Sequence, residues 1–78
     1  MKREEKVIVV FDSTAHAMEM EAVCQKSKIS GRLIPTPSNI TAGCGLAWCA
    51  ERIYKKQLMT FLDEMELEYR GIYNVMLY

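Results

Sequence analysis

The sequence predicts a small α+β domain whose elements follow one another in the order β-α-β-β-α-β. Short runs of β-branched and aromatic residues alternate with two segments of helical period, and prolines with small residues separate the two middle strands. A chain of 78 residues has room for one such unit and one thin core. We therefore expect residues 1–78 to form a single domain, with residues 1–5 as a flexible N-terminus.

The first strand and the first helix have the clearest patterns. Residues 6–11 are apolar or β-branched at almost every position, which is typical of a central strand buried on both faces. The helix expected over residues 14–28 follows Asp12, Ser13 and Thr14, which can cap the free amides of its first turn. Its apolar face consists of Ala17, Met20, Val23 and Cys24. Cys24 is thus expected in the core.

The second half of the chain predicts two strands, a helix and a final strand. Arg32–Pro35 is a short strand closed by proline, and residues 45–50 form the third strand. The second helix is expected over residues 51–65 without a capping side chain before it, and the last strand over residues 69–77. The apolar stripe of this helix consists of Tyr54, Leu58, Phe61, Leu62 and Met65.

The order of elements also predicts the topology. Right-handed crossovers in both βαβ halves give a four-stranded antiparallel sheet in the order 4-1-3-2, with both helices on one face. This is the ferredoxin-like fold. Its other face is left uncovered, yet the first and last strands carry apolar residues at both parities. We therefore expect a homodimer, or a docked partner, on the helix-free face of the sheet.

Composition argues against several classes of function. Ten basic and ten acidic residues cancel, so the chain lacks the positive field that attracts nucleic acid. No apolar window reaches the roughly 18 residues of a membrane-spanning helix, and the N-terminal residues precede no signal-peptide core. The sequence therefore predicts a cytoplasmic protein whose three cysteines are free thiols. We expect no cofactor.

Cys44 is the candidate reactive residue, because glycines on both sides free the backbone and remove bulk around its sulfur. The topology places the start of the third strand beside the end of the first, where the first helix begins. A helix N-terminus stabilises a thiolate. The residues expected to support Cys44 are Ser13, Thr14, His16, Pro37, Thr41, Gly43 and Gly45. Both residues also have a purely structural interpretation. Cys44 would then be a thiol that happens to lie in a tight turn, and His16 would be a packed or capping residue.

Three segments carry a resemblance to a known family. Residues 11–17 (FDSTAHA), 32–37 (RLIPTP) and 44–47 (CGLA) resemble the selenium/sulfur (Se/S) carrier protein-like family of small bacterial and archaeal domains. The resemblance covers residues 7–73. It implies that the cysteine before Gly45 carries a persulfide or perselenide between a donor protein and an acceptor protein.

The loop before this cysteine departs from the family pattern. Ser38 and Asn39 stand where such proteins commonly have arginine and glutamate, and residues 41–43 stand where serines often precede the cysteine. A contact to an anionic group through that arginine is therefore not carried over to this chain.

Two functions of different classes remain open. The first is a sulfur or selenium carrier that acts through Cys44 and is more an accessory protein than a true enzyme. The second is a non-catalytic binding module that uses the open sheet face or residues 35–45. A thiol-redox enzyme lacks a suitably spaced second cysteine. A metal site would have only Asp12, His16 and Cys44 as ligands, and RNA binding lacks both charge and stacking aromatic residues.

Overall fold

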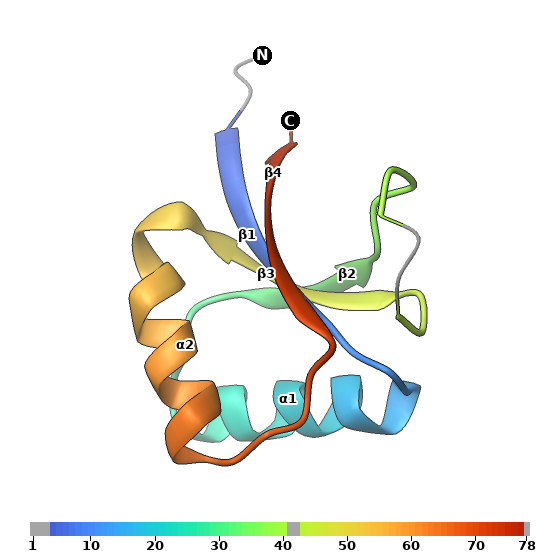
Figure 1. The fold of residues 1–78 in the computed structure, drawn as a ribbon. Coiled ribbons are helices and arrows are strands. Elements are labelled where there is room, and N and C mark those ends of the chain that lie inside the picture. The colour runs from blue at the N-terminus through green and yellow to red at the C-terminus, as the bar shows by residue number, and fades with distance from the viewer. Residues whose placement is uncertain (1–3, 41–42, 78) are drawn as a thin grey trace.

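The protein folds in the expected order, as shown by a computed structural model that describes residues 4–40 and 43–77 (Figure 1). Thr41, one of the predicted supporting residues, lies outside the described residues. The elements are β1 (Glu4–Val10), α1 (Thr14–Lys26), β2 (Arg32–Pro35), β3 (Leu46–Glu51), the 3₁₀ turn η1 (Arg52–Tyr54), α2 (Lys55–Glu64) and β4 (Gly71–Leu77).

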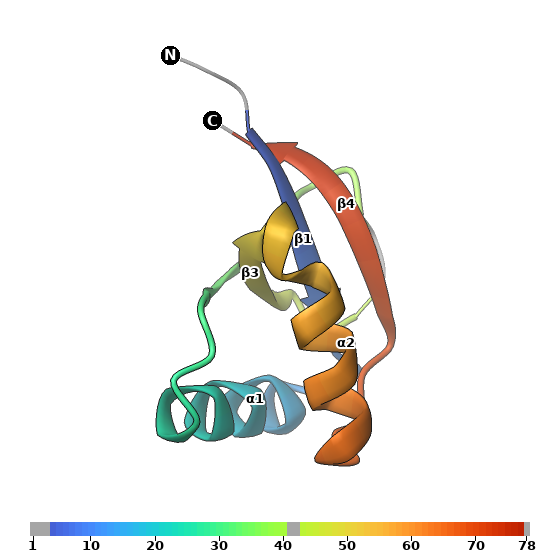
Figure 2. The same cartoon turned by 90° about the vertical axis from the view of Figure 1, so that its left-hand side faces the viewer.

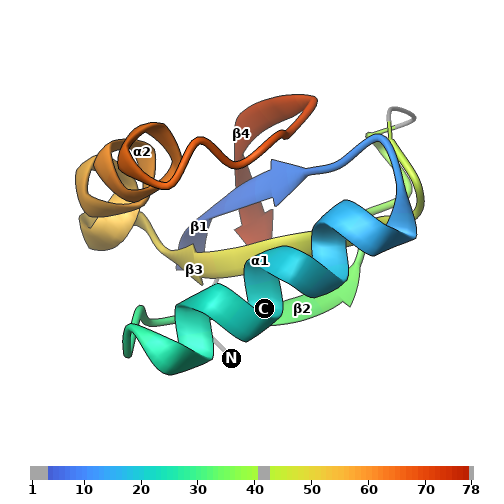
Figure 3. The same ribbon diagram turned by 90° about the horizontal axis from the view of Figure 1, so that it is seen from below.

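The four strands form one sheet in the order β2-β3-β1-β4, and every neighbouring pair is antiparallel. Figure 2 shows both helices on the same side of the sheet, and residues of both helices join one buried cluster with the sheet. Seen from below in Figure 3, α1 runs under β3 and β2. The predicted ferredoxin-like arrangement, order 4-1-3-2 read from the other edge, is confirmed.

Strand β1 is the centre of the sheet and is buried on both faces. Val7, Ile8, Val9 and Val10 are all 0% exposed, as the unbroken apolar run predicted. Alternate residues contribute to two cores. The helix-face core contains Val7, Val9, Phe11, Ala17, Met20, Cys24, Trp48, Ala50, Leu58, Phe61 and Leu62. The helix-free-face core contains Ile8, Val10, Ala47, Cys49 and Val75.

The helix-free face exposes less apolar surface than its strand residues alone suggest. Ile34 of β2 and Ile40 of the loop between β2 and β3 pack against its core. Figure 1 shows that β4 curves strongly along the sheet, and its Val75 is only 8% exposed. Tyr73, which pairs with Ile8, keeps 38% of its surface open. Much of the apolar area that motivated the expected homodimer is therefore covered within one chain.

Element ends differ from expectation where capping decides them. The helix α2 begins at Lys55 rather than at residue 51, because no side chain caps this segment and the chain first makes η1. Met65 lies just after the helix and is 46% exposed, so it does not extend the apolar stripe. The helix α1 ends at Lys26 because Lys28 takes a positive φ of 57°.

The N-terminal boundary of the sheet also differs. Strand β1 begins at Glu4, so Glu4 and Glu5 pair with β4 instead of belonging to a flexible N-terminus. Their pairing partners are Leu77 and Met76, respectively. Pairing with the last strand extends β1 beyond its apolar run, which is why the hydrophobic pattern alone placed its start later.

Candidate functional site

One backbone hydrogen bond fixes the position of Cys44. Its amide donates to the carbonyl oxygen of Phe11 at 2.8 Å. Phe11 follows β1 and precedes Ser13, the N-cap of α1, by two residues. The loop end that carries Cys44 therefore lies beside the segment that enters α1, where the strand order predicted it.

The start of α1 is capped as the sequence predicted. The Ser13 hydroxyl oxygen accepts a hydrogen bond from the amide of His16 at 3.2 Å. Thr14 is the first helical residue and its side chain is exposed. The remaining free amides of this first turn give the helix a partial positive charge at this end. A direct supporting role of Ser13 or Thr14 for the Cys44 thiol stays a prediction.

The two glycines beside Cys44 have different structural reasons. Gly43 and Gly45 both take positive φ, at 90° and 95°. A Cβ at Gly43 would lie 2.7 Å from the carbonyl oxygen of Phe11, so a side chain would displace the backbone there. A Cβ at Gly45 would meet no atom within 4 Å. Gly43 thus allows the close approach to β1, whereas Gly45 is bordered by open space.

Cys44 differs from the other two cysteines in burial. All three lie within the described residues and are free thiols, but Cys24 and Cys49 are buried while Cys44 is half-buried. Burial raises the pKa of Cys24 to about 11 and also raises the pKa of Cys49. The Cys44 sulfur packs against the helix-face core, 3.9 Å from the carbonyl oxygen of Leu46. It is therefore the thiol most open to a reagent.

Two backbone hydrogen bonds shape the loop that leads to Cys44. The Thr36 amide donates to the carbonyl oxygen of Gly45 at 2.9 Å and closes the loop at its base. The Ile40 amide donates to the carbonyl oxygen of Pro37 at 2.9 Å and makes a turn. Pro35 ends β2, as expected from its missing amide hydrogen. Pro37 therefore belongs to a turn in the first half of this loop, where its carbonyl oxygen accepts the Ile40 hydrogen bond.

His16 makes its side-chain contact with a residue that sequence reasoning did not single out. Its Nε2 lies 3.2 Å from Oε2 of Glu68, an interaction that becomes an ion pair when the imidazole is protonated. Its Nδ1 is buried and has no hydrogen-bond partner among the described residues. The buried Nδ1 is consistent with the packed alternative for His16, the cap of α1 is Ser13, and the contact with Glu68 was not expected from the sequence.

Arg70 is a second residue that the sequence analysis missed. Its amide donates to the carbonyl oxygen of Val10 at 2.7 Å, and its Nη1 lies 2.8 Å from Oδ1 of Asp12. Arg70 and Glu68 thus attach the segment before β4 to the end of β1 and the start of α1. The signal available in the sequence was the strand order, which places the start of β4 beside the end of β1.

Two further kinds of feature are absent from the described part of the chain. Residues 4–40 and 43–77 contain no group of three or more His, Cys, Asp or Glu side chains placed to hold a metal ion. Asp12, His16 and Cys44 therefore do not form such a group. Over the same residues, no helix has the length and apolar character needed to cross a membrane.

Fold and site together define a small ferredoxin-like domain that presents one half-buried thiol at a glycine-flanked loop end. The chain belongs to the family described as "Putative Se/S carrier protein-like", which matches residues 6–74. The matched region includes Cys44, its flanking glycines and both prolines of the loop. No curated protein and no solved structure matches the chain.

Proposed function

We propose that the protein is a sulfur or selenium carrier in which Cys44 receives the transferred atom from a donor protein and delivers it to an acceptor protein. The observation that carries the proposal is the contrast in access, since Cys44 alone among the three cysteines is not buried. The open space beside Gly45 leaves room for a partner protein next to this loop end. The family description supports the same role. Such a protein is an accessory of cytoplasmic enzymes.

The transfer step needs only thiol chemistry. The Cys44 thiolate attacks the outer sulfur of a persulfide on the donor protein, and a new S–S bond forms as the donor's S–S bond breaks. The donor cysteine leaves as a thiolate, and Cys44 becomes the persulfide. A thiolate on the acceptor side reverses the roles, so neither step consumes an oxidant, a reductant or a cofactor. Selenium would follow the same sequence of bonds.

The surroundings of Cys44 suit this chemistry. The thiolate is the nucleophile in sulfur transfer. The backbone hydrogen bond to Phe11 brings the Cys44 loop next to the Ser13-capped end of α1. We expect Ser13, Thr14 and His16 to act by keeping this helix end in place beside the loop, rather than by touching the transferred atom.

Mass spectrometry tests the proposal. The protein is incubated with a cysteine desulfurase and cysteine, and the expected result is a gain of one sulfur on the peptide that contains Cys44. Cys44→Ser should abolish the gain, whereas the matched variant Cys49→Ser should retain it. A folded wild-type protein that gains no sulfur from any of several desulfurases would contradict the carrier role. That result would favour the binding module with no thiol chemistry.

A homodimer through the helix-free face is a separate proposal. It is supported by Tyr73, which pairs with Ile8 of the helix-free-face core and keeps 38% of its surface exposed. The interface would leave the Cys44 loop end accessible to a donor. Light scattering at micromolar concentration should give twice the mass of one chain, and a strict monomer would exclude this assembly.

A further inference from the structure

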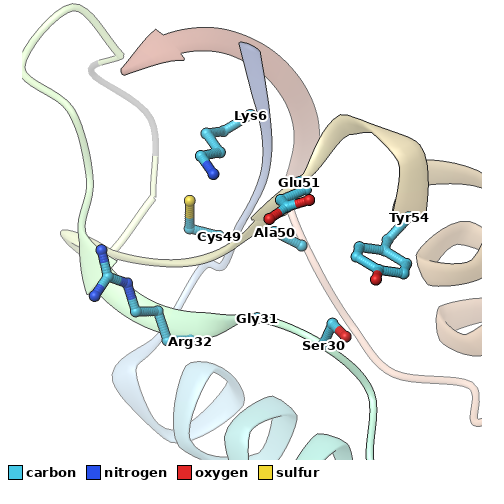
Figure 4. Close-up of a pocket in the computed structure, with 8 residues that line it drawn as sticks. All are labelled: Lys6, Ser30, Gly31, Arg32, Cys49, Ala50, Glu51 and Tyr54. Carbon is cyan, nitrogen blue, oxygen red and sulfur yellow. The ribbon is translucent and has the colours of Figure 1, made fainter. Parts of the chain in front are cut away.

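A second cysteine-containing feature lies at the opposite end of β3 from Cys44. A pocket of about 340 Å³ is lined by residues from β1, β2, β3 and η1 and by the two residues before β2. Figure 4 shows that the amino group of Lys6 and the sulfur of Cys49 point toward each other, with Arg32 on the other side of Cys49. Glu51, Tyr54 and Ser30 line the rest.

The wall of this pocket is fixed by the core. Gly31 takes a φ of 133°, and a Cβ there would overlap Trp48 Nε1 and lie 2.7 Å from the carbonyl oxygen of Cys49. The Trp48 indole N–H donates to the carbonyl oxygen of Ser30 at 3.3 Å. Trp48 is 2% exposed, so this wall is held by a buried side chain. The pocket is therefore formed without a ligand.

The charges around Cys49 favour a negative group in the pocket. Burial raises the pKa of the Cys49 thiol, while the nearby charges of Lys6 and Arg32 act in the opposite direction. Both positive charges are thus felt at the base of the pocket. A guanidinium offers a planar pair of donors that suits carboxylate and phosphate oxygens, and an ammonium adds a compact charge. Glu51 pairs with Lys6 in the β1–β3 ladder and lies between Cys49 and Tyr54 (Figure 4), so its carboxylate would repel an anion from that part of the pocket.

We propose that this pocket binds a small molecule through a carboxylate or phosphate group, which lies between Lys6 and Arg32 above Cys49. The organic part of the ligand extends toward the Tyr54 ring. A volume of about 340 Å³ suits a small metabolite rather than a peptide. The site is separate from Cys44 and requires no sulfur transfer.

Two alkylating reagents that differ in charge test the site. Iodoacetate is an anion and iodoacetamide is neutral, and in both reactions the thiolate forms an S–C bond as iodide leaves. Their rate ratio at one cysteine cancels the fraction of thiolate. We expect the iodoacetate-to-iodoacetamide ratio to be about fivefold higher at Cys49 than at Cys44, and to fall with added salt. Equal and salt-independent ratios at the two cysteines would overturn the proposal.

A matched pair of variants locates the effect. Arg32→Gln should lower the ratio at Cys49, whereas Lys56→Gln removes the same charge from α2, away from this pocket, and should leave it unchanged. An equal response to both substitutions would mean that overall charge, not the pocket, guides the reagent. Urea unfolding curves of both variants show whether each remains folded.

An NMR titration gives an answer even if Cys49 resists both reagents. Inorganic phosphate and acetate are added separately to the isotope-labelled wild-type chain at constant ionic strength. Saturating shifts of the Gly31 and Arg32 amide signals support the site, and the stronger of the two anions identifies the preferred group. Absence of saturation with both anions contradicts it. Neither result depends on Cys44, so failure here is distinct from failure of the carrier role.

Discussion

Cys44 and Cys49 lie only five positions apart, yet the structure gives them opposite surroundings. Cys44 stands at a loop end, half-buried, with open space beside Gly45. Cys49 lies within β3 and belongs to the buried helix-free-face core. The difference arises from the backbone, because a strand interior fixes a side chain to one face while a glycine-flanked turn does not.

The comparison also separates access from charge. Burial raises the pKa of Cys49. Its two cationic neighbours, Lys6 and Arg32, act to lower this pKa but have the smaller effect. Cys44 is less buried than Cys49, and its amide bonds to Phe11 just before the start of α1. We therefore expect exposure to make Cys44 the first thiol to react, and neighbouring charge to determine whether Cys49 reacts better with anionic or with neutral reagents.

Differential alkylation should show the largest effect. With its pKa raised to about 11, roughly one in a thousand Cys24 thiols is ionised at pH 8. We expect iodoacetamide to label Cys44 more than about a hundredfold faster than Cys24, and also faster than Cys49, as read by peptide mapping of a timed pulse. The three rates should converge in the urea-unfolded chain. A folded chain in which Cys24 or Cys49 matches Cys44 would remove the distinction.

Valine substitutions at the two glycines should sharpen the description of the loop. Gly43→Val brings Cβ to 2.7 Å from the Phe11 carbonyl oxygen and forces a β-branched residue to positive φ, so we expect a loss of more than about 3 kcal/mol in the free energy of unfolding. Gly45→Val has only the second problem and should lose about 1–3 kcal/mol. Urea unfolding measures both. Equal losses would mean that the two positions are not structurally distinct.

Alkaline unfolding should give the smallest of the three effects. The Cys24 pKa is raised from 9.0 to about 11, so the stability linked to its neutral thiol is fully present below pH 9 and is lost as the pH rises toward 11. The two pH units correspond to about 2.7 kcal/mol in all, of which roughly 1.7 kcal/mol is lost between pH 8.5 and 10.5. Urea unfolding at these two pH values should show that loss in the wild type and in Cys44→Ala. A Cys24→Ala variant with an equally steep loss would contradict the assignment.

The fold was largely predictable because its signals are local. The unbroken apolar run of β1, the helical periods and the proline that closes β2 each reflect burial or backbone geometry of a single element. Their order then leaves few topologies. The start of α2 was less predictable, because a missing cap shifts a helix by one turn without changing its apolar stripe.

The site was predictable only in part. Strand order placed the Cys44 loop beside the start of α1, and the structure shows the contact through Phe11. The roles of Glu68 and Arg70 required knowledge of where the segment before β4 turns, which no periodicity encodes. The pocket at Cys49 was hidden for the same reason, since it joins residues of β1, β2, β3 and η1. The covering of the helix-free face by Ile40 depends on a loop conformation.

The central place of β1 has a consequence for how the chain acquires its fold. Among the described residues this strand pairs with β3 on one edge and with β4 on the other, and Lys6 lies opposite Glu51 and Val75. On a ribosome, β1 is made before both of its partner strands, so one edge stays unpaired until β3 has been made and the other until β4 follows. Closing such long loops before any strand pairing is entropically costly and slows folding relative to a helical bundle of equal size. The apolar run of β1 is therefore without its sheet partners in a nascent chain until β3 and β4 have been made, and exposed apolar surface of this kind promotes aggregation.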